Sequence, residues 1–313
     1  PEVIKGLSEK EITQLRKKFE IELVKQIAKT TANIHWVFLL MAWVYPIDCA
    51  MLAALRNTSI NDAKEILKEA QTYVFVKQLP NNSFKLHDEM HRMIGVYVWP
   101  QVDRTQELRL EYSNIALQYF EKMIDQIENE IVFLKGQDDK QLTWQSEIEE
   151  KRQQFWGMQE QRLKHSLIVN INDGLNLFEQ IYEATSTDAS ITFRPQFIRL
   201  VEDKRRQLSV EQAALLDYYQ ADQLFYQEAD YVKARTIIEA LLNIDKLPLE
   251  LQIKSIKLRG NIIIRQGEVD EAIEDFSKAV SMSKDIEHTV LLIQSTNALG
   301  WAYRVRGDLE QAL

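Results

Sequence analysis

The 313-residue chain contains 9 glycines and 6 prolines, and its formal net charge is −9. Glycine and proline interrupt helices and form turns, so their scarcity predicts a mostly helical protein with short connections. The acidic charge argues against sequence-independent nucleic-acid binding, which requires a basic surface. A single cysteine, Cys49, excludes a disulfide within the chain and favours a reducing, cytoplasmic location.

The longest apolar run, residues 37–45, is too short to span a bilayer and stops at Pro46 and Asp48. No signal peptide precedes this run, so we expect no membrane association. The chain starts at Pro1 and stops within a helical pattern. We therefore expect it to be an internal fragment of a longer protein.

The first part of the chain is expected to contain a leading helix within residues 1–32, where Ser8 and Glu11 form a capping-box pattern. Residues 33–102 then contain three segments with helical periodicity, the third starting at Ser59. Two segments with a period of two, VFVKQL and FKLH, follow on either side of the turn PNNS, which predicts a β-hairpin. Three helices followed by a hairpin is the order of elements in a winged-helix domain.

Residues 103–205 are expected to form a helical arm of long amphipathic segments interrupted after Gly136. Gly174 and Phe178 stand at positions that suit close helix packing, so part of the arm is a candidate degenerate repeat. Pro195 is placed as in the first turn of a further helix.

Residues 206–313 contain an internal repeat. In its two clearest copies, Gly260 matches Gly300, Gly267 matches Gly307 and Ala272 matches Ala312. A weaker copy lies earlier in the chain and has Ala229 and Ala234 at the positions of Gly267 and Ala272. Small residues at these positions allow two antiparallel helices to approach closely, and each helix pair needs a neighbouring pair to cover its open side. The pattern resembles the tetratricopeptide repeat, although these copies are longer than its usual unit of about 34 residues.

The predicted fold class is therefore all-α, with a winged-helix domain carrying one β-hairpin, a helical arm and an α-solenoid of tetratricopeptide-like repeats. The predicted domain boundaries are 1–32 for the leading helix, 33–102 for the winged-helix domain, 103–205 for the helical arm and 206–313 for the repeats.

Residues 84–91, FKLHDEMH, suggest two kinds of site. His87 and His91 resemble the two histidines of the zinc motif H-E-x-x-H, which must share one face of a helix. Here His87 belongs to the second strand, and Asp88 has the position of a helix N-cap, so the two rings are not expected to face the same metal. We assign no metal-binding and no catalytic residue.

The other interpretation comes from the neighbouring elements. A winged helix that ends in L-H-D and is followed by tetratricopeptide-like repeats resembles the winged-helix domain of STAND-class signalling ATPases. The resemblance implies that His87 contacts the β-phosphate of bound ADP and that Asp88 is a neighbouring structural acid. An imidazole is a suitable phosphate donor because its charge changes near neutral pH. A histidine that only closes the hairpin by local hydrogen bonding is the alternative.

The chain departs from this family in one respect, because it contains no G-x-x-x-x-G-K-[ST] phosphate-binding loop. We therefore expect no enzymatic activity from this chain alone. ADP or ATP is expected only in a full-length parent with a nucleotide-binding domain outside this chain.

The repeats supply a candidate surface for a protein or peptide ligand. In the register given above, five side chains project from the inward-facing helices, and amide and basic groups of this kind can bind an acidic segment or a chain terminus. They are Lys257, Asn261, Arg265, Asn297 and Arg304. Four nearby aromatic residues are expected to be packing residues, namely Tyr218, Tyr219, Phe225 and Tyr226.

The function indicated by these features is the regulatory and ligand-sensing portion of a STAND-type ATPase, with possible trigger-dependent assembly of identical chains. A non-enzymatic interaction scaffold is the first alternative. The second is a transcription regulator, but the third helix of the winged-helix segment balances Lys64 and Lys68 with Asp62, Glu65 and Glu69, which is a poor charge pattern for binding DNA.

Overall fold

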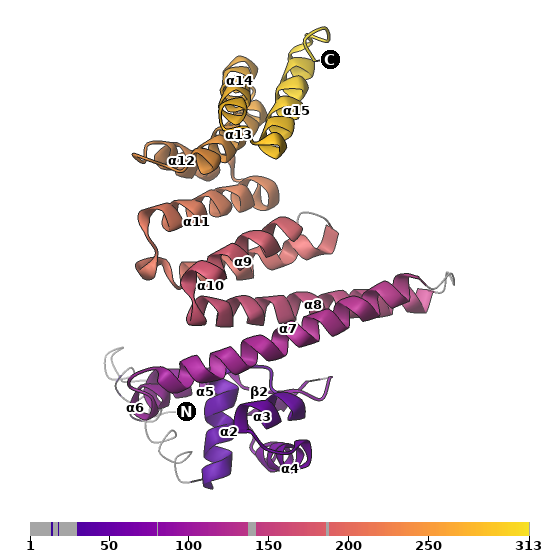
Figure 1. The fold of residues 1–313 in the computed structure, drawn as a ribbon, viewed down its shortest axis with the longest axis vertical. Coiled ribbons are helices and arrows are strands. Elements are labelled where there is room, and N and C mark those ends of the chain that lie inside the picture. The colour runs from indigo at the N-terminus through magenta and orange to yellow at the C-terminus, as the bar shows by residue number, and fades with distance from the viewer. Residues whose placement is uncertain are drawn as a thin grey trace, which may run out of the picture. The chain divides into compact units, whose positions relative to one another are not determined.

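The computed structural model describes Gln14, Lys18 and residues 30–79, 81–136, 142–185 and 188–312. In these residues the fold is all-α apart from one two-stranded antiparallel sheet, as predicted (Figure 1). Most of the leading helix predicted within residues 1–32 lies outside the described residues. No helix in the described part of the chain combines the length and the apolar character needed to cross a membrane.

The chain divides into two compact units, Pro1–Leu177 and Phe178–Leu313. The division falls inside the segment 103–205 that was predicted as a helical arm. The predicted domain boundaries remain predictions, and each unit is described by itself.

The first unit contains three helices and a hairpin in the predicted order, namely α2 (Ala32–Trp43), α3 (Cys49–Arg56), α4 (Ile60–Ala70), β1 (Val76–Gln78) and β2 (Phe84–Leu86). Capping side chains define where two of the helices start. The carboxylate of Asp48 accepts a hydrogen bond from the Met51 N–H at 2.7 Å, and the hydroxyl of Ser59 accepts one from the Asp62 N–H at 3.1 Å.

Helix α2 forms the centre of the core of this unit. Its residues 37–42 are all buried, which explains why the sequence has no polar face there. After the hairpin the chain continues through α5 (Asp88–Met93), a π-helical turn η2 (Ile94–Val98) and α6 (Trp99–Val102). The fully buried Trp99 donates its indole N–H to the carbonyl oxygen of Leu39 at 3.1 Å, which joins α6 to α2.

Two long helices that pack against each other, α7 (Glu107–Lys135) and α8 (Leu142–Val169), bury His165. The hydroxyl oxygen of Ser113 accepts the indole N–H of Trp43 at 3.0 Å and lies 3.2 Å from Nδ1 of His165. Nε2 of the same ring is buried and has no hydrogen-bond partner among the described residues. Burial and the nearby Lys164 hold the pKa of His165 well below its usual range.

We expect the first unit to lose stability as the pH falls below about 6.5. Below this pH the histidine of the unfolded chain binds a proton, whereas His165 of the folded chain stays neutral because its pKa is lowered. Acid therefore favours the unfolded chain. The free energy of unfolding should fall by up to about 1.4 kcal/mol per pH unit.

The measurement is urea unfolding between about pH 5 and 8 for the native chain and for His165→Asn, with His87→Asn as the matched control. The His165→Asn variant should show a smaller dependence on pH, because its side chain takes up no proton on unfolding. A dependence equal to that of the native chain would contradict the assignment to His165.

The second unit begins within α9 (Ile171–Ala184) and continues as helices. They are η3 (Asp188–Phe193), α10 (Arg194–Glu202), η4 (Arg205–Gln207), α11 (Val210–Gln223), the π-helical turn η5 (Leu224–Glu228), α12 (Tyr231–Leu242), α13 (Leu249–Gln266), α14 (Val269–Asp285) and α15 (Thr289–Arg306). Contacts join α11 to α12, α12 to α13, α13 to α14 and α14 to α15, so neighbouring helices pack in chain order as in a helical repeat.

The matched small residues of the repeat have matched conformations. Ala229, Gly267 and Gly307 all have positive φ angles, of 53°, 92° and 97°, at the ends of their helices. Gly260 allows a close contact between α13 and α14, because a Cβ added there would lie 2.7 Å from the ring of Phe276. The residues at the turn position of the predicted repeat thus share a left-handed backbone conformation.

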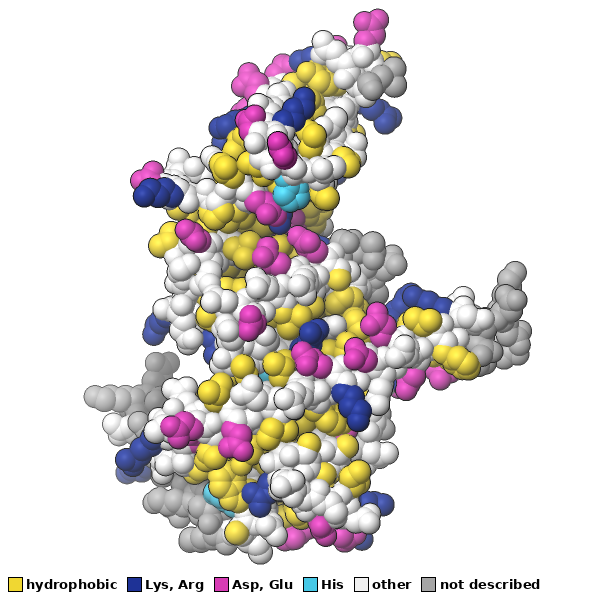
Figure 2. Space-filling view, viewed as in Figure 1, with side chains coloured by type: hydrophobic (Ala, Val, Ile, Leu, Met, Phe, Trp, Pro, Cys, Tyr) yellow, Lys and Arg dark blue, Asp and Glu magenta, His cyan; other side chains and the backbone are white. Residues whose placement is uncertain are grey.

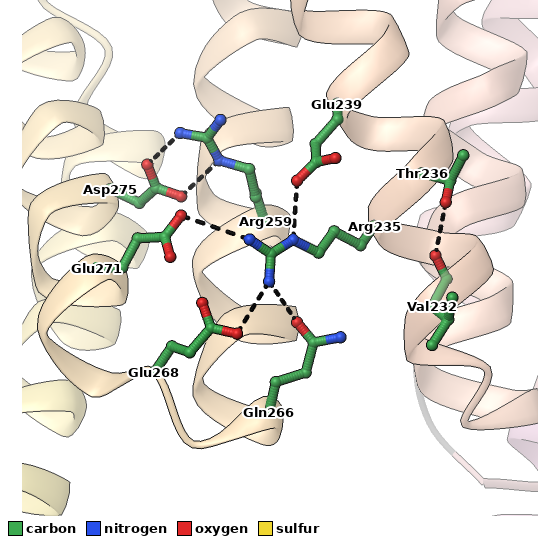
Figure 3. Close-up of polar contacts among 9 residues, drawn as sticks. All are labelled: Val232, Arg235, Thr236, Glu239, Arg259, Gln266, Glu268, Glu271 and Asp275. Atoms are coloured by element: carbon green, nitrogen blue, oxygen red, sulfur yellow. Dashed lines mark hydrogen bonds and ion pairs between the residues drawn. The ribbon is translucent and has the colours of Figure 1, made fainter.

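A network of charged side chains holds α12 against the turn between α13 and α14 (Figure 3). The guanidinium of Arg235 donates to Glu239 at 2.8 Å, to Gln266 at 2.7 Å and to Glu268 at 3.1 Å, and it lies 3.6 Å from Glu271. Because one planar guanidinium serves four acceptors on different elements, the network fixes the position of α12 relative to the next helix pair.

Candidate functional site

The first candidate residue, His87, lies where the hairpin ends and α5 begins. Its backbone N–H donates to the carbonyl oxygen of Phe75 at 2.8 Å, which extends the pairing of the hairpin by one residue beyond β2. His87 is the residue that precedes the helix, with φ −58° and ψ 145°, and its side chain makes no capping hydrogen bond. The ring is exposed, so a ligand outside this chain can reach it.

The sequence-based interpretation of Asp88 as a helix cap is wrong. Asp88 is the first residue of α5, and His87 occupies the cap position because the hairpin keeps the backbone extended up to that residue. The carboxylate of Asp88 is almost fully exposed and lies 3.8 Å from Nζ of Lys85. A carboxylate in the first turn of a helix is still favoured by the helix dipole.

The second histidine of this stretch, His91, has a different environment from His87. Its ring is half-buried and packs edge-on against Tyr45, with 4.7 Å between the ring centroids. Burial, followed by the charge of Lys164, lowers the pKa of His91. One imidazole is thus exposed and the other is packed into the protein. The described residues contain no group of three or more His, Cys, Asp or Glu side chains that could hold a metal ion.

Three of the five residues predicted to bind a partner lie on α13. Lys257, Asn261 and Arg265 follow one another at intervals of four residues, which places them on one face of the helix. The ammonium of Lys257 donates to the side-chain oxygen of Gln294 on α15 at 2.5 Å, and burial lowers the pKa of Lys257. This contact turns the predicted face of α13 toward α15.

The other two predicted residues lie on α15, where they follow Gln294. Asn297 and Arg304 are both exposed, and Trp301 stands between them with 38% of its surface exposed. Since residues three, four and seven apart share a helix face, these side chains lie on the side of α15 that carries Gln294. We call the surface formed by Lys257, Asn261, Arg265, Asn297 and Arg304 the basic face.

Two cations of the basic face make no ion pair with a described residue. The guanidinium groups of Arg265 and Arg304 are exposed on α13 and α15. By contrast, Arg235 on α12 and Arg259 on α13 are held by carboxylates, and Arg259 pairs with Asp275 at 2.5 Å. The basic face therefore has positive charge available for a ligand.

Aromatic side chains beside the basic face were only partly predicted. Tyr218, Tyr219 and Phe225 are buried, as expected of packing residues. Tyr226 packs edge-on against Phe225, with 4.6 Å between the ring centroids, but 56% of its surface is exposed, so the prediction that it serves in packing holds only in part. Trp301 occupies an aromatic packing position of the tetratricopeptide-like pattern, yet 38% of its surface is exposed. An exposed tryptophan beside an arginine is a common feature of protein interfaces.

Beneath the basic face lies a buried polar network that was not predicted from the sequence. Arg194 at the start of α10 donates to Asp222 on α11 at 3.1 Å and to the hydroxyl of Thr185 at 3.2 Å, and its guanidinium lies 4.2 Å from the ring centre of Tyr182. The hydroxyl of Tyr182 donates to Asp222 at 3.0 Å. Burial raises the pKa of Asp222, whereas Arg194 lowers it. Asp222 is thus paired with Arg194, and its charge also acts on Lys257 of the basic face.

Comparison with known proteins shows little similarity in sequence. No protein-family model matches the chain, and no curated protein matches it. Among solved structures, the chain is similar to the signal transduction ATPase with numerous domains (STAND) protein with a tetratricopeptide repeat sensor from Pyrococcus horikoshii. The identity is 11% and the TM-score 0.28, over 94% of this chain and 51% of that chain. The chain thus spans about half the length of that protein, and its function has to be argued from its own residues.

Proposed function

We propose that this chain is the regulatory and ligand-sensing portion of a STAND-type signalling ATPase. The second unit recognises an acidic segment of a partner protein through the basic face. The first unit passes this event to a nucleotide-binding domain outside this chain, and assembly of identical chains is a possible output. The observation that carries the proposal is the pair of exposed arginines, Arg265 and Arg304, which make no ion pair with a described residue and stand beside Tyr226 and Trp301.

The chemistry of the basic face defines the class of ligand. Guanidinium groups bind carboxylates in bidentate geometry, and the amides of Asn261 and Asn297 can bond to the peptide backbone. Exposed Tyr226 and Trp301 offer apolar surface for side chains next to the acidic ones. An extended acidic peptide is therefore the ligand that this surface fits best.

We expect a fluorescein-labelled peptide rich in glutamate to bind the chain, with affinity that falls as salt is added. Removing one charge by Arg265→Gln or Arg304→Gln should weaken binding about fivefold, because an exposed ion pair contributes up to about 1 kcal/mol. Fluorescence anisotropy measures the affinity, and Arg206→Gln, an exposed arginine on η4, is the control. Equal affinities for all four proteins would contradict the proposed ligand site.

The role of His87 in the proposal follows from its position. Its exposed ring stands at a junction of strand and helix that is fixed by backbone hydrogen bonds, so a phosphate held by another domain could be contacted without rearrangement of this unit. A ligand can shift a two-state protein only by binding one state better than the other. In the proposal ADP favours the closed state through His87, and the partner favours the open state through the basic face.

We expect His87→Ala in the full-length parent to weaken retention of ADP and to raise basal ATPase activity. Loss of one hydrogen bond to a charged group corresponds to about 1.5–3 kcal/mol, or roughly 10- to 150-fold in ADP affinity. Lys77→Ala, an exposed change on β1 of the same hairpin, is the matched control. Unchanged ADP release in His87→Ala would exclude the phosphate contact.

A plain interaction scaffold is the second candidate function, and the sequence favours it in one respect because it contains no phosphate-binding loop. The two candidates differ in the outcome of the two experiments. If the chain is a scaffold, Arg265→Gln weakens peptide binding and His87→Ala leaves the retention of ADP unchanged. If the chain is the proposed sensor, Arg265→Gln weakens peptide binding and His87→Ala weakens the retention of ADP.

A further inference from the structure

A pocket of about 260 Å³ opens in the second unit beside the N-terminal end of α13. Its apolar walls come from Leu215 on α11, Pro248 before α13 and Leu251 on α13. This volume is below the roughly 300–1,000 Å³ of sites for small molecules, and it suits one long side chain.

The charged residues of the pocket are mostly acidic. Glu179 on α9, Glu211 at the start of α11 and Glu250 at the start of α13 line it, with Lys254 as the cation. Nζ of Lys254 lies 3.1 Å from Glu250 and 3.5 Å from Glu183, so this lysine is already paired. Figure 2 shows acidic side chains beside apolar surface in the region of α11.

Two of these carboxylates make no ion pair with a described residue, although burial and then the charge of Lys254 act in opposite directions on the pKa of Glu179. Glu211 is exposed and makes no ion pair with a described residue. Glu179 accepts a hydrogen bond from the hydroxyl of Tyr219 at 3.3 Å, and its burial raises the pKa of its carboxyl group. The pocket therefore has a net negative charge and apolar walls, which together match a long basic side chain with its methylene stem and charged end.

The pocket and the basic face are continuous along α13. Lys254 lines the pocket, Lys257 follows one turn later, and Asn261 and Arg265 complete the same face. From Lys254 to Arg265 the helix rises by about 16 Å. An extended peptide covers that distance in about five residues, at roughly 3.3 Å per residue.

We propose that this pocket binds a lysine or arginine side chain of the partner peptide, about five residues away from the acidic residues that contact Arg265. The inference depends on the proposed function and adds to it a second, oppositely charged subsite. The partner is then a peptide with separated charges rather than a uniformly acidic one. Its basic residue fixes the position of the peptide along α13, and its acidic residues fill the basic face.

The test uses the full chain and fluorescein-labelled peptides with one lysine and two glutamates separated by five positions, made in both sequence orders. A comparison peptide carries norleucine, which has the apolar stem but no ammonium group, in place of lysine. The lysine peptide should bind about fivefold more tightly at low salt. Glu211→Gln should remove that advantage and leave the affinity for the norleucine peptide unchanged. Glu179→Gln serves as an independent second variant.

The outcomes separate this inference from the function on which it depends. If the two peptides bind equally and Arg265→Gln weakens both, the pocket assignment is wrong and the basic face remains the ligand site. If Glu211→Gln and Glu179→Gln weaken the norleucine peptide as much as the lysine peptide, the pocket assignment is also wrong. If neither peptide binds, or if binding is independent of Arg265, both proposals are wrong.

Discussion

Arg194→Met is expected to lower the free energy of unfolding of the second unit by about 3–5 kcal/mol. Arg194 is buried, with 6% of its surface exposed, and is the cation that pairs with the buried Asp222. Removing it leaves the carboxylate of Asp222 without its paired cation and with the hydroxyl of Tyr182 as its remaining hydrogen-bond donor. Because burial already raises the pKa of Asp222, this group must then either stay charged at high cost or take up a proton.

Hydrogen exchange followed by mass spectrometry measures this effect, because it reports the stability of α10 and α11 separately from that of the first unit. The double variant Arg194→Met with Asp222→Leu should recover most of the loss, since no unpaired charge remains buried. Arg205→Met, which breaks a half-exposed pair with Asp217, is the matched control and should cost about 1 kcal/mol or less. A loss below 1 kcal/mol in Arg194→Met would contradict the buried pair.

Gly260→Ala is expected to destabilise the second unit by about 1–3 kcal/mol. Alanine is the better helix former by up to about 1 kcal/mol, so propensity alone predicts the opposite sign. The new methyl group would lie 2.7 Å from the ring of Phe276, and α13 and α14 would have to separate to make room for it.

The comparison variant is Gly157→Ala on α8, where an added Cβ meets no atom within 4 Å and stabilisation is expected. Phe276→Leu should cost much less in the Gly260→Ala background than in the native chain, because the smaller side chain removes the overlap. Urea unfolding of the native chain, the three single variants and the double variant provides the comparison. Stabilisation by Gly260→Ala would show that the two helices do not pack closely at this position.

The fold could be predicted from the sequence wherever a local pattern determines the structure. Three such features depend only on near neighbours in the chain. They are the apolar residues at helical spacing, the helix cap at Ser59 and the turn between VFVKQL and FKLH. The small residues of the repeat were also informative, because a close contact between helices such as that at Gly260 leaves no room for a Cβ atom.

Features that depend on distant residues could not be predicted in this way. Arg194 and Asp222 are separated by 28 positions, and no local pattern indicates that they pair. The sequence pattern also did not indicate the π-helical turn η5, in which Tyr226 is 56% exposed. The pocket is formed by α9, α11 and α13 together and leaves no signature in any one segment.

The central claim, that the basic face binds acidic segments through its exposed arginines, is tested most directly by exchanging the charges. The double variant Arg265→Glu with Arg304→Glu should lose affinity for a glutamate-rich peptide and gain affinity for a lysine-rich peptide of the same length, as measured by fluorescence anisotropy at low salt. We expect the preference between the two peptides to reverse. An unchanged preference for the glutamate-rich peptide in the double variant would contradict the claim.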